Sequence, residues 1–258
     1  MKLGLDYYVD ASIAILRTYE PAEGYYVGFA GGKDSLVVYD LIKLAGVKAE
    51  FYYEATGLDA PETVRYIKNF SDVTINPLKV TMWKLILQHK FPPLVNKRYC
   101  CRYLKERGGR GRVVVTGVRA EESVKRRQYS IVCKHKKYHK TLIYPILQWP
   151  EYLVWQYIRE RGLQYNPLYD EGWTRIGCIG CPMATKESRI KQLERWPHFK
   201  IAYLRTFAKL LDILSEKEKE SKGWYTPEDV LVWWLNEAHP RSQPNKNQLS
   251  FIDENTLI

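Results

Sequence analysis

Hydrophobic and polar positions along the chain follow two periods, one typical of strands and one typical of helices. Short runs rich in apolar and β-branched residues predict five strands: Tyr25–Phe29, Ala49–Glu54, Val73–Asn76, Arg112–Thr116 and Thr141–Tyr144. Apolar residues at helical spacing predict helices before and between most of them: Tyr7–Tyr19, Leu36–Leu44, Pro61–Phe70 and Thr81–His89. This alternation predicts an α/β fold with a doubly wound, five-stranded parallel sheet.

The pattern changes after the last predicted strand. Further amphipathic helices are predicted at Pro150–Arg161, Glu187–Trp196, Lys200–Lys217 and Pro227–Ala238. The charge run Glu216–Lys222 is interpreted as a solvated helix end, and residues 239–258 as a loose polar tail. We therefore expect an α/β domain over residues 1–185 and a helical C-terminal extension with a tail over 186–258.

A glycine-rich turn follows the first predicted strand. Its sequence, residues 28–35, is GFAGGKDS, and a helix is predicted directly after it. Backbone N–H groups of such a turn and the helix N-terminus bind phosphate, and the spacing is not that of the Walker motif. The alternative is a plain turn capped by Asp34. The residues predicted to bind phosphate and Mg²⁺ are Ala30, Gly31, Gly32, Lys33, Asp34 and Ser35.

Composition narrows the class of protein. The chain has 258 residues, 45% of them hydrophobic, and a formal net charge of +11. This excess of positive charge favours a polyanionic partner, either a nucleotide or a nucleic acid. The alternative is a basic surface that is only solvated. No apolar run approaches the length of a membrane span, and the N-terminus lacks a signal-peptide pattern. We expect a cytoplasmic protein with no membrane partner.

The five cysteines form a pattern that suits a metal better than disulfides. Cys100 and Cys101 are adjacent, and Cys178 and Cys181 form a CxxC pair, whereas Cys133 lies apart. Four thiolates can close a zinc site or hold an iron–sulfur cluster, and from the residues alone both alternatives, and unliganded thiols, stay open.

Several ordered motifs resemble one known family. Residues 55–63 read ATGLDAPET, residues 117–123 read GVRAEES, and residues 165–172 read YNPLYDEG. Together with the GGKDS turn and the CC…CxxC set, they resemble the phosphoadenosine phosphosulfate reductase family of the PP-loop superfamily, over roughly residues 20–185. The resemblance implies a [4Fe-4S] cluster on Cys100, Cys101, Cys178 and Cys181, with zinc as the alternative metal.

Two departures from the reductases point to another branch of the family. Reductases carry a catalytic cysteine near the C-terminus, whereas this chain has no cysteine after Cys181. The GGKDS turn is intact, apart from Ala30 in place of the usual serine, which fits an enzyme that splits ATP into AMP and pyrophosphate. The resemblance thus implies an iron–sulfur ATP pyrophosphatase of the kind found in DNA phosphorothioation.

On this interpretation the protein is a sulfurtransferase that adenylylates a nucleic-acid acceptor, either DNA or tRNA, with a cysteine desulfurase as possible sulfur donor. The alternative is a reductase of adenylyl sulfate that produces sulfite, and a third is an inactive nucleotide-binding relative. Lys33, Asp34 and Arg119 are the predicted catalytic residues. Gly117 and Asp59 are further nucleotide-binding candidates, where Asp59 contacts Mg²⁺ or a ribose hydroxyl, or only caps a helix.

Basic residues cluster in two further segments. Arg107, Arg110 and Arg112, with residues 126–139, are predicted to form a polyanion-binding face. Within it Cys133 is either a spare cysteine or a persulfide carrier. Trp149, Trp155 and Trp173 are predicted to be core or cluster-shielding residues.

Overall fold

The computed structural model describes residues 4–135 and 138–237. Contacts divide the chain into two compact units, one made of residues up to 79 and 102–178, the other of residues 80–101 and those from 179 onward. Each unit is described by itself. The division predicted after residue 185 is a different one and stays a prediction.

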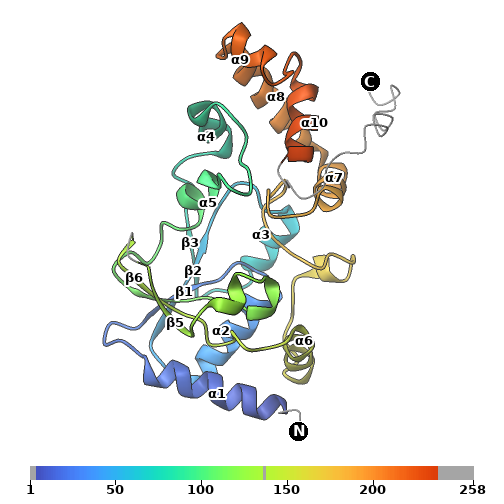
Figure 1. Cartoon of the computed structure of the whole chain (residues 1–258). Coiled ribbons are helices and arrows are strands. Elements are labelled where there is room, and N and C mark those ends of the chain that lie inside the picture. Colours follow the sequence, from blue (N-terminus) through green and yellow to red (C-terminus); the bar gives the residue numbers. More distant parts are fainter. Residues whose placement is uncertain (1–3, 136–137, 238–258) are drawn as a thin grey trace. The chain divides into compact units, whose positions relative to one another are not determined.

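The first unit is built on a six-stranded sheet with the order β3-β2-β1-β4-β6-β5 (Figure 1). The parallel strands are β1 (Tyr25–Gly28), β2 (Ala49–Glu54), β3 (Val73–Asn76), β4 (Val113–Val115) and β6 (Lys140–Ile143). They match the five predicted strands within one residue at most ends. Because the chain adds strands first to one side of β1 and then to the other, the order reverses between β1 and β4. In such sheets ligands bind at the carboxyl ends of the strands at this reversal.

The predicted count of five strands is wrong by one. An additional edge strand, β5 (Val132–His135), pairs antiparallel with β6. Its sequence alternates poorly, since Lys134 and His135 follow Val132 and Cys133, and a sheet edge requires less burial than a central strand. The prediction of an α/β fold with a doubly wound, mostly parallel sheet is confirmed.

Three helices of the first unit pack against one another and form the core with one face of the sheet. They are α1 (Leu5–Thr18), α2 (Lys33–Ala45) and α6 (Glu151–Glu160). Leu16, Leu41 and Val154, one from each helix, are completely buried. A shorter helix, α3 (Pro61–Ile67), begins at a proline, as predicted. This packing fixes the N-terminus of α2 directly after β1.

The second unit is helical. It contains α4 (Met82–His89), α7 (Lys186–Arg195), α8 (Pro197–Asp212), α9 (Glu216–Glu220) and α10 (Pro227–Glu237), and α5 (Tyr99–Leu104) begins in it. The single helix predicted over Lys200–Lys217 is wrong, because α8 ends at Asp212 and α9 begins anew with a capping box between Ser215 and Glu218. No helix was predicted for α5. The predicted tail over 239–258 lies outside the described residues.

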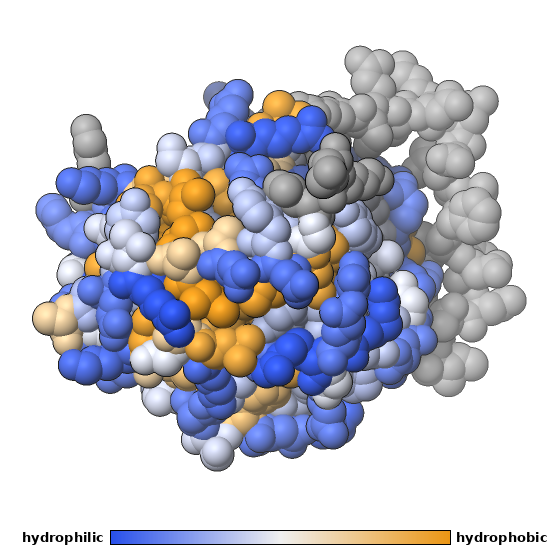
Figure 2. Space-filling model, turned by 90° about the horizontal axis from the view of Figure 1, so that it is seen from below, coloured by the Kyte–Doolittle hydropathy of each residue, from blue (hydrophilic) through white to orange (hydrophobic). Residues whose placement is uncertain are grey.

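The surface is mixed. On the face shown in Figure 2, hydrophobic residues gather in patches that hydrophilic residues cross and surround. Among the residues that the structure describes, no helix has the length and apolar character needed to cross a membrane.

Candidate functional site

The glycine-rich turn between β1 and α2 has a conformation that requires glycine. Gly31 has a φ of +71°, and a Cβ there would approach the side chains of Ile67 and Thr63 to between 3.0 and 3.2 Å. Asn166 holds the turn by donating from Nδ2 to the Gly31 carbonyl at 3.3 Å and to Thr63 Oγ1 at 3.0 Å. The turn is therefore fixed from both sides.

Ser35 closes the turn from within. Its hydroxyl donates to the Gly32 carbonyl at 2.8 Å and accepts from the Ala30 N–H at 3.3 Å. The N-cap of α2 is Gly32, and it makes no side-chain cap hydrogen bond. The alternative in which Asp34 caps this helix is thus wrong, because the Asp34 carboxylate has other partners.

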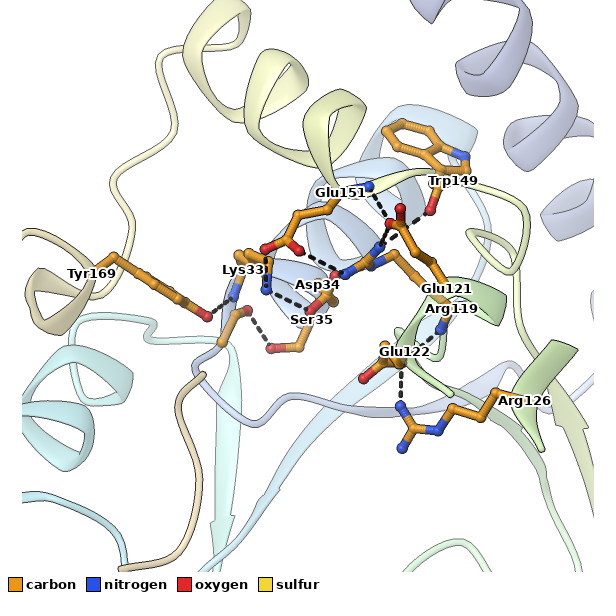
Figure 3. Close-up of polar contacts among 11 residues, drawn as sticks. Lys33, Asp34, Ser35, Arg119, Glu121, Glu122, Arg126, Trp149, Glu151 and Tyr169 are labelled. Atoms are coloured by element: carbon orange, nitrogen blue, oxygen red, sulfur yellow. Dashed lines mark hydrogen bonds and ion pairs between the residues drawn. The ribbon is translucent and has the colours of Figure 1, made fainter. Parts of the chain in front are cut away.

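Lys33 is almost completely buried, with 6% of its surface exposed. Its Nζ lies 3.5 Å from Asp34 Oδ2 and 3.3 Å from Glu151 Oε1. Its backbone N–H donates to the Tyr169 hydroxyl at 2.9 Å. Tyr169 belongs to the short 3₁₀ helix Pro167–Tyr169. Two distant segments therefore fix this lysine at the start of α2 (Figure 3).

Arg119 lies in the loop after β4 and is 3% exposed. Its Nε donates to Asp34 Oδ1 at 2.5 Å and its Nη1 to Glu121 Oε2 at 2.9 Å. Burial lowers the pKa of Arg119, but Asp34 and Glu121 more than offset this, so the pKa lies above its ordinary value. The guanidinium is therefore permanently charged beside Lys33.

Gly117 allows this loop to approach α2. A Cβ at position 117 would lie 2.7 Å from the backbone carbon and oxygen of Asp34. The predicted phosphate turn and the predicted GVRAEES segment thus meet in space, at the point where the strand order reverses. Glycine is required here because of close contact, since no other side chain fits.

Carboxylates surround the two buried cations of the site. The cations Lys33 and Arg119 face the carboxylates of Asp34, Glu121 and Glu151. Glu151 is 48% exposed and lies 4.0 Å from Arg119 Nη2, so it is a partner that an incoming anion can displace. Binding of phosphate by Lys33 and of Mg²⁺ by Asp34 stays a prediction.

Asp59 does not act as a helix cap, which was one of its three predicted roles. The N-cap of α3 is Ala60, without a side-chain cap bond, so Asp59 does not cap this helix. Its Oδ2 accepts hydrogen bonds from the hydroxyls of Tyr53 and Thr56, both at 2.6 Å. The Cys178 thiol in turn donates to Thr56 Oγ1 at 3.6 Å. The predicted contacts of Asp59 with Mg²⁺ or ribose stay predictions.

Three of the four predicted metal-binding cysteines lie in the second unit. Cys100 and Cys101 are in the first turn of α5, and Cys181 precedes α7. None of the five cysteines forms a disulfide. Within the described residues, no group of three or more His, Cys, Asp or Glu side chains is arranged to hold a metal ion. The cluster and the zinc alternative stay predictions.

A buried arginine bears on whether the second unit suits a cluster. Arg189 in α7 is completely buried, and its Nη1 donates to the carbonyls of Trp234 and Leu235 at 3.1 and 3.4 Å. Its Nε and Nη2 have no hydrogen-bond partner among the described residues. Burial lowers the pKa of Arg189 to about 10, and Tyr203 and, more weakly, Cys181 oppose this shift. A buried guanidinium near Cys181 suits an anionic group at this place, and the predicted four-cysteine cluster stays a prediction.

The predicted basic face is partly neutralised. Arg112 pairs with Glu50 at 2.8 Å, and Arg107 lies 3.7 Å from Glu54. Arg110 lies over the Tyr138 ring, 5.8 Å from its centroid. Part of the predicted face falls on residues 136–137, outside the described residues. Cys133 donates to the Ser130 carbonyl at 3.2 Å. Trp149 and Trp173 are buried, whereas Trp155 is only half-buried.

Sequence reasoning missed three residues of the site: Glu121, Glu151 and Tyr169. Tyr169 falls in the YNPLYDEG segment, so the motif was the available signal. Glu121 lies in the GVRAEES segment. Glu151 has no such signal, because an acidic residue in the first turn of a helix is ordinarily explained by the helix dipole.

Comparison with known proteins identifies the family of the chain. A family model of the phosphoadenosine phosphosulfate reductase domain matches residues 24–184. The adenosine 5′-phosphosulfate reductase of Staphylococcus haemolyticus is 28% identical over 195 residues, which are 71% of this chain and 79% of the relative. The adenosine 5′-phosphosulfate reductase of Staphylococcus epidermidis is 30% identical over 193 residues, which are 70% of this chain and 78% of the relative. An uncharacterized protein of Methanocaldococcus jannaschii is 29% identical over 234 residues, which are 86% of this chain but only 54% of the relative.

Solved structures show the same fold. The phosphoadenylyl-sulfate reductase of Candida auris superposes with a TM-score of 0.50 at 20% identity, covering 69% of this chain and 97% of that one. The FMN adenylyltransferase of Candida glabrata gives a TM-score of 0.50 at 13% identity, covering 68% and 62%. At these identities the likeness concerns the fold alone. Since the family model spans more than half of the sequence, the chain belongs to the phosphoadenosine phosphosulfate reductase domain family and has a PP-loop fold.

Proposed function

We propose that the protein is an ATP pyrophosphatase-type sulfurtransferase that adenylylates an oxygen of a nucleic-acid acceptor. The observation that carries the proposal is the buried Lys33, fixed beside Arg119 in an intact GGKDS turn. Two buried cations at a helix N-terminus suit a triphosphate, whose leaving group carries more charge than that of a phosphosulfate.

The residues of the site have distinct roles in this reaction. Backbone N–H groups of the turn and the helix N-terminus bind the β- and γ-phosphates. Lys33, released from Glu151, neutralises charge on the departing pyrophosphate, and Arg119 orients the α-phosphate. The acceptor oxygen attacks the α-phosphorus, the bond to the bridging oxygen breaks, and pyrophosphate leaves with that electron pair. Sulfur that the donor delivers as a persulfide is first released as sulfide by a thiol reductant, which is oxidised to a disulfide. Sulfide then attacks the activated atom of the acceptor, the bond from that atom to the AMP oxygen breaks, and AMP leaves with that electron pair.

A bound iron–sulfur cluster, held by Cys100, Cys101, Cys178 and Cys181, would supply a site for holding sulfur. DNA phosphorothioation is the favoured context and tRNA thiolation a variant of it, with a cysteine desulfurase as sulfur donor. The +11 charge supports a polyanionic acceptor.

Product analysis tests the proposal. Protein purified without oxygen is incubated with ATP labelled at the α-phosphate, with and without oligonucleotide. AMP and pyrophosphate are expected, and Lys33→Ala should lower their formation about a hundredfold, as for loss of a charge that stabilises the leaving group. Lys68→Ala, which removes an exposed lysine, is the matched control. Release of ADP and inorganic phosphate would overturn the proposal.

The second candidate function is reduction of adenylyl sulfate to sulfite. It is supported by the adenosine 5′-phosphosulfate reductases that are 28% and 30% identical to this chain. Sulfite formation from adenosine phosphosulfate and a thiol reductant, without cleavage of ATP, would favour this candidate.

A further inference from the structure

A cavity of about 260 Å³ lies next to the phosphate turn, within the first unit. Two of its lining residues also contact Lys33 in the phosphate turn. Glu151 pairs with Lys33 at 3.3 Å, and the Tyr169 hydroxyl accepts from the Lys33 N–H at 2.9 Å. A ligand in this cavity therefore lies close to any phosphate bound at Lys33.

Aromatic rings form much of its wall. The Trp155 ring is nearly perpendicular to those of Tyr165 and Tyr169, with centroids 5.3 and 5.0 Å away. Trp173 lines the cavity as well. Aromatic platforms of this kind bind planar rings, and stacking of one nucleobase contributes about 1–3 kcal/mol. Pockets for drug-sized ligands have volumes of about 300–1,000 Å³, so this cavity suits a single base.

The charged groups of the cavity are carboxylates. Glu151 and Asp170 contribute carboxylates, and no lysine or arginine is among its lining residues. Asp170 accepts from the Tyr165 hydroxyl at 2.8 Å, which fixes the carboxylate at the wall. Carboxylates repel phosphate but accept hydrogen bonds from the exocyclic amines of bases, as they do from N4 of cytosine. The cavity thus suits the base, and Lys33 beside it suits the phosphate.

We propose that this cavity binds one nucleobase that carries an exocyclic amino group, contributed by the acceptor strand. The inference rests on the proposed function and names the acceptor class at that site. An organic cation is a poorer occupant, although aromatic rings and carboxylates attract cations. The Lys33 ammonium lies 5.7 Å from the centroid of the Tyr169 ring and would repel a second cation. A nucleotide instead brings a phosphate that Lys33 attracts.

Binding measurements on the full chain test the inference. The probes are (dC)10, (dA)10 and (dT)10, a (dC)10 with one abasic position, a non-hydrolysable ATP analogue, and tetramethylammonium as an organic cation. Trp155→Leu removes a stacking surface and should weaken binding of (dC)10 and (dA)10 about tenfold, as expected for loss of one stacked base. Trp155→Phe keeps a ring and should restore most of the affinity. Asp170→Asn should reduce the preference for (dC)10 over (dT)10, whereas Asp212→Asn on the exposed side of α8 should not.

The probes separate two sources of the base. If Trp155→Leu weakens binding of the oligonucleotides alone, the cavity belongs to the acceptor strand. If it weakens binding of the ATP analogue equally, the cavity binds the adenine of ATP, which overturns the acceptor assignment. Unchanged affinity of folded Trp155→Leu for every probe, or a dependence seen only with tetramethylammonium, overturns base binding altogether. Cleavage of ATP is measured separately. Base-dependent binding without AMP formation would refute the proposed function and leave the cavity assignment intact.

Discussion

Arg119 and Asp34, which are 85 positions apart in sequence, join a loop to a helix, with Nε of the arginine 2.5 Å from Oδ1 of the aspartate. The pair connects the carboxyl end of β4 to the first turn of α2. It places a guanidinium beside Lys33, and both cations depend on the same carboxylate.

Replacing this carboxylate tests the coupling. Asp34→Asn leaves the buried Arg119 with one acidic partner fewer and should lower the free energy of unfolding by about 2 kcal/mol. Urea denaturation measures the effect, and Asp212→Asn is the control. ATP cleavage should fall as well, because Lys33 loses a partner. Equal stability of Asp34→Asn and the wild type would contradict a structural role of the pair.

Gly117→Ala tests the close approach of the two loops. The added Cβ would lie 2.7 Å from the Asp34 backbone, so one loop must shift. We expect a loss of about 1–3 kcal/mol in unfolding free energy and impaired ATP cleavage. Gly177→Ala is the matched control, because a Cβ there meets nothing within 4 Å. If both variants behave alike, the contact does not constrain the site.

Tyr169→Phe removes the hydroxyl that accepts from Lys33 N–H. Burial raises the pKa of Tyr169 well above its ordinary value of 10. The unfolded tyrosine therefore ionises first, and its stabilising contribution is present below pH 10 and lost as the pH rises further. At pH 8 the free energy of unfolding of the wild type should be about 1 kcal/mol higher than that of Tyr169→Phe. This difference should disappear as the pH rises above 10. The measurement is urea unfolding across this range, with the exposed Tyr7→Phe as control.

Metal analysis tests the cysteine assignment. Protein purified without oxygen should contain iron and acid-labile sulfide, and Cys101→Ser or Cys181→Ser should lose both, whereas Cys133→Ser should retain them. Arg189→Met should weaken retention of iron, because it removes a buried cation whose charge acts on Cys181, and Arg205→Met on the exposed side of α8 should not. Stoichiometric zinc without sulfide would refute the cluster.

Salt dependence tests the nucleic-acid partner. Binding of oligonucleotides should weaken as salt rises, by a slope of about 0.7–0.9 per phosphate contact in log affinity against log salt. Replacing Lys134, Lys136 and Lys137 together by alanine should flatten this slope. The same charge removed at Lys200, Lys209 and Lys217 should change it less. Absence of binding to single- and double-stranded DNA and to RNA at low salt would exclude this partner class.

The sequence predicts those parts of the fold in which burial leaves a local pattern. Val113–Val115 is a central strand and reads as an apolar run, and Pro61 begins a helix. By contrast, β5 lies at an edge of the sheet, where polar residues are tolerated, so its sequence shows no apolar pattern that predicts a strand. The short α5 contains too few residues for a helical period to be visible.

The site follows the same rule. The glycines and Lys33 form a contiguous motif, so they were predictable. The contact between Lys33 and Glu151 joins residues 118 positions apart, and only the packing of α6 against α2 brings them together. Local patterns contain no information about such a contact.

The two outermost strands of the sheet, β3 and β5, are each only four residues long. A strand with unpaired backbone groups is a template on which a second chain can extend the sheet, and a short strand offers few of these groups. Lys134 adds an exposed charge along one of them. Short margins and an exposed charge thus leave few backbone groups on which another copy of the chain could extend this sheet.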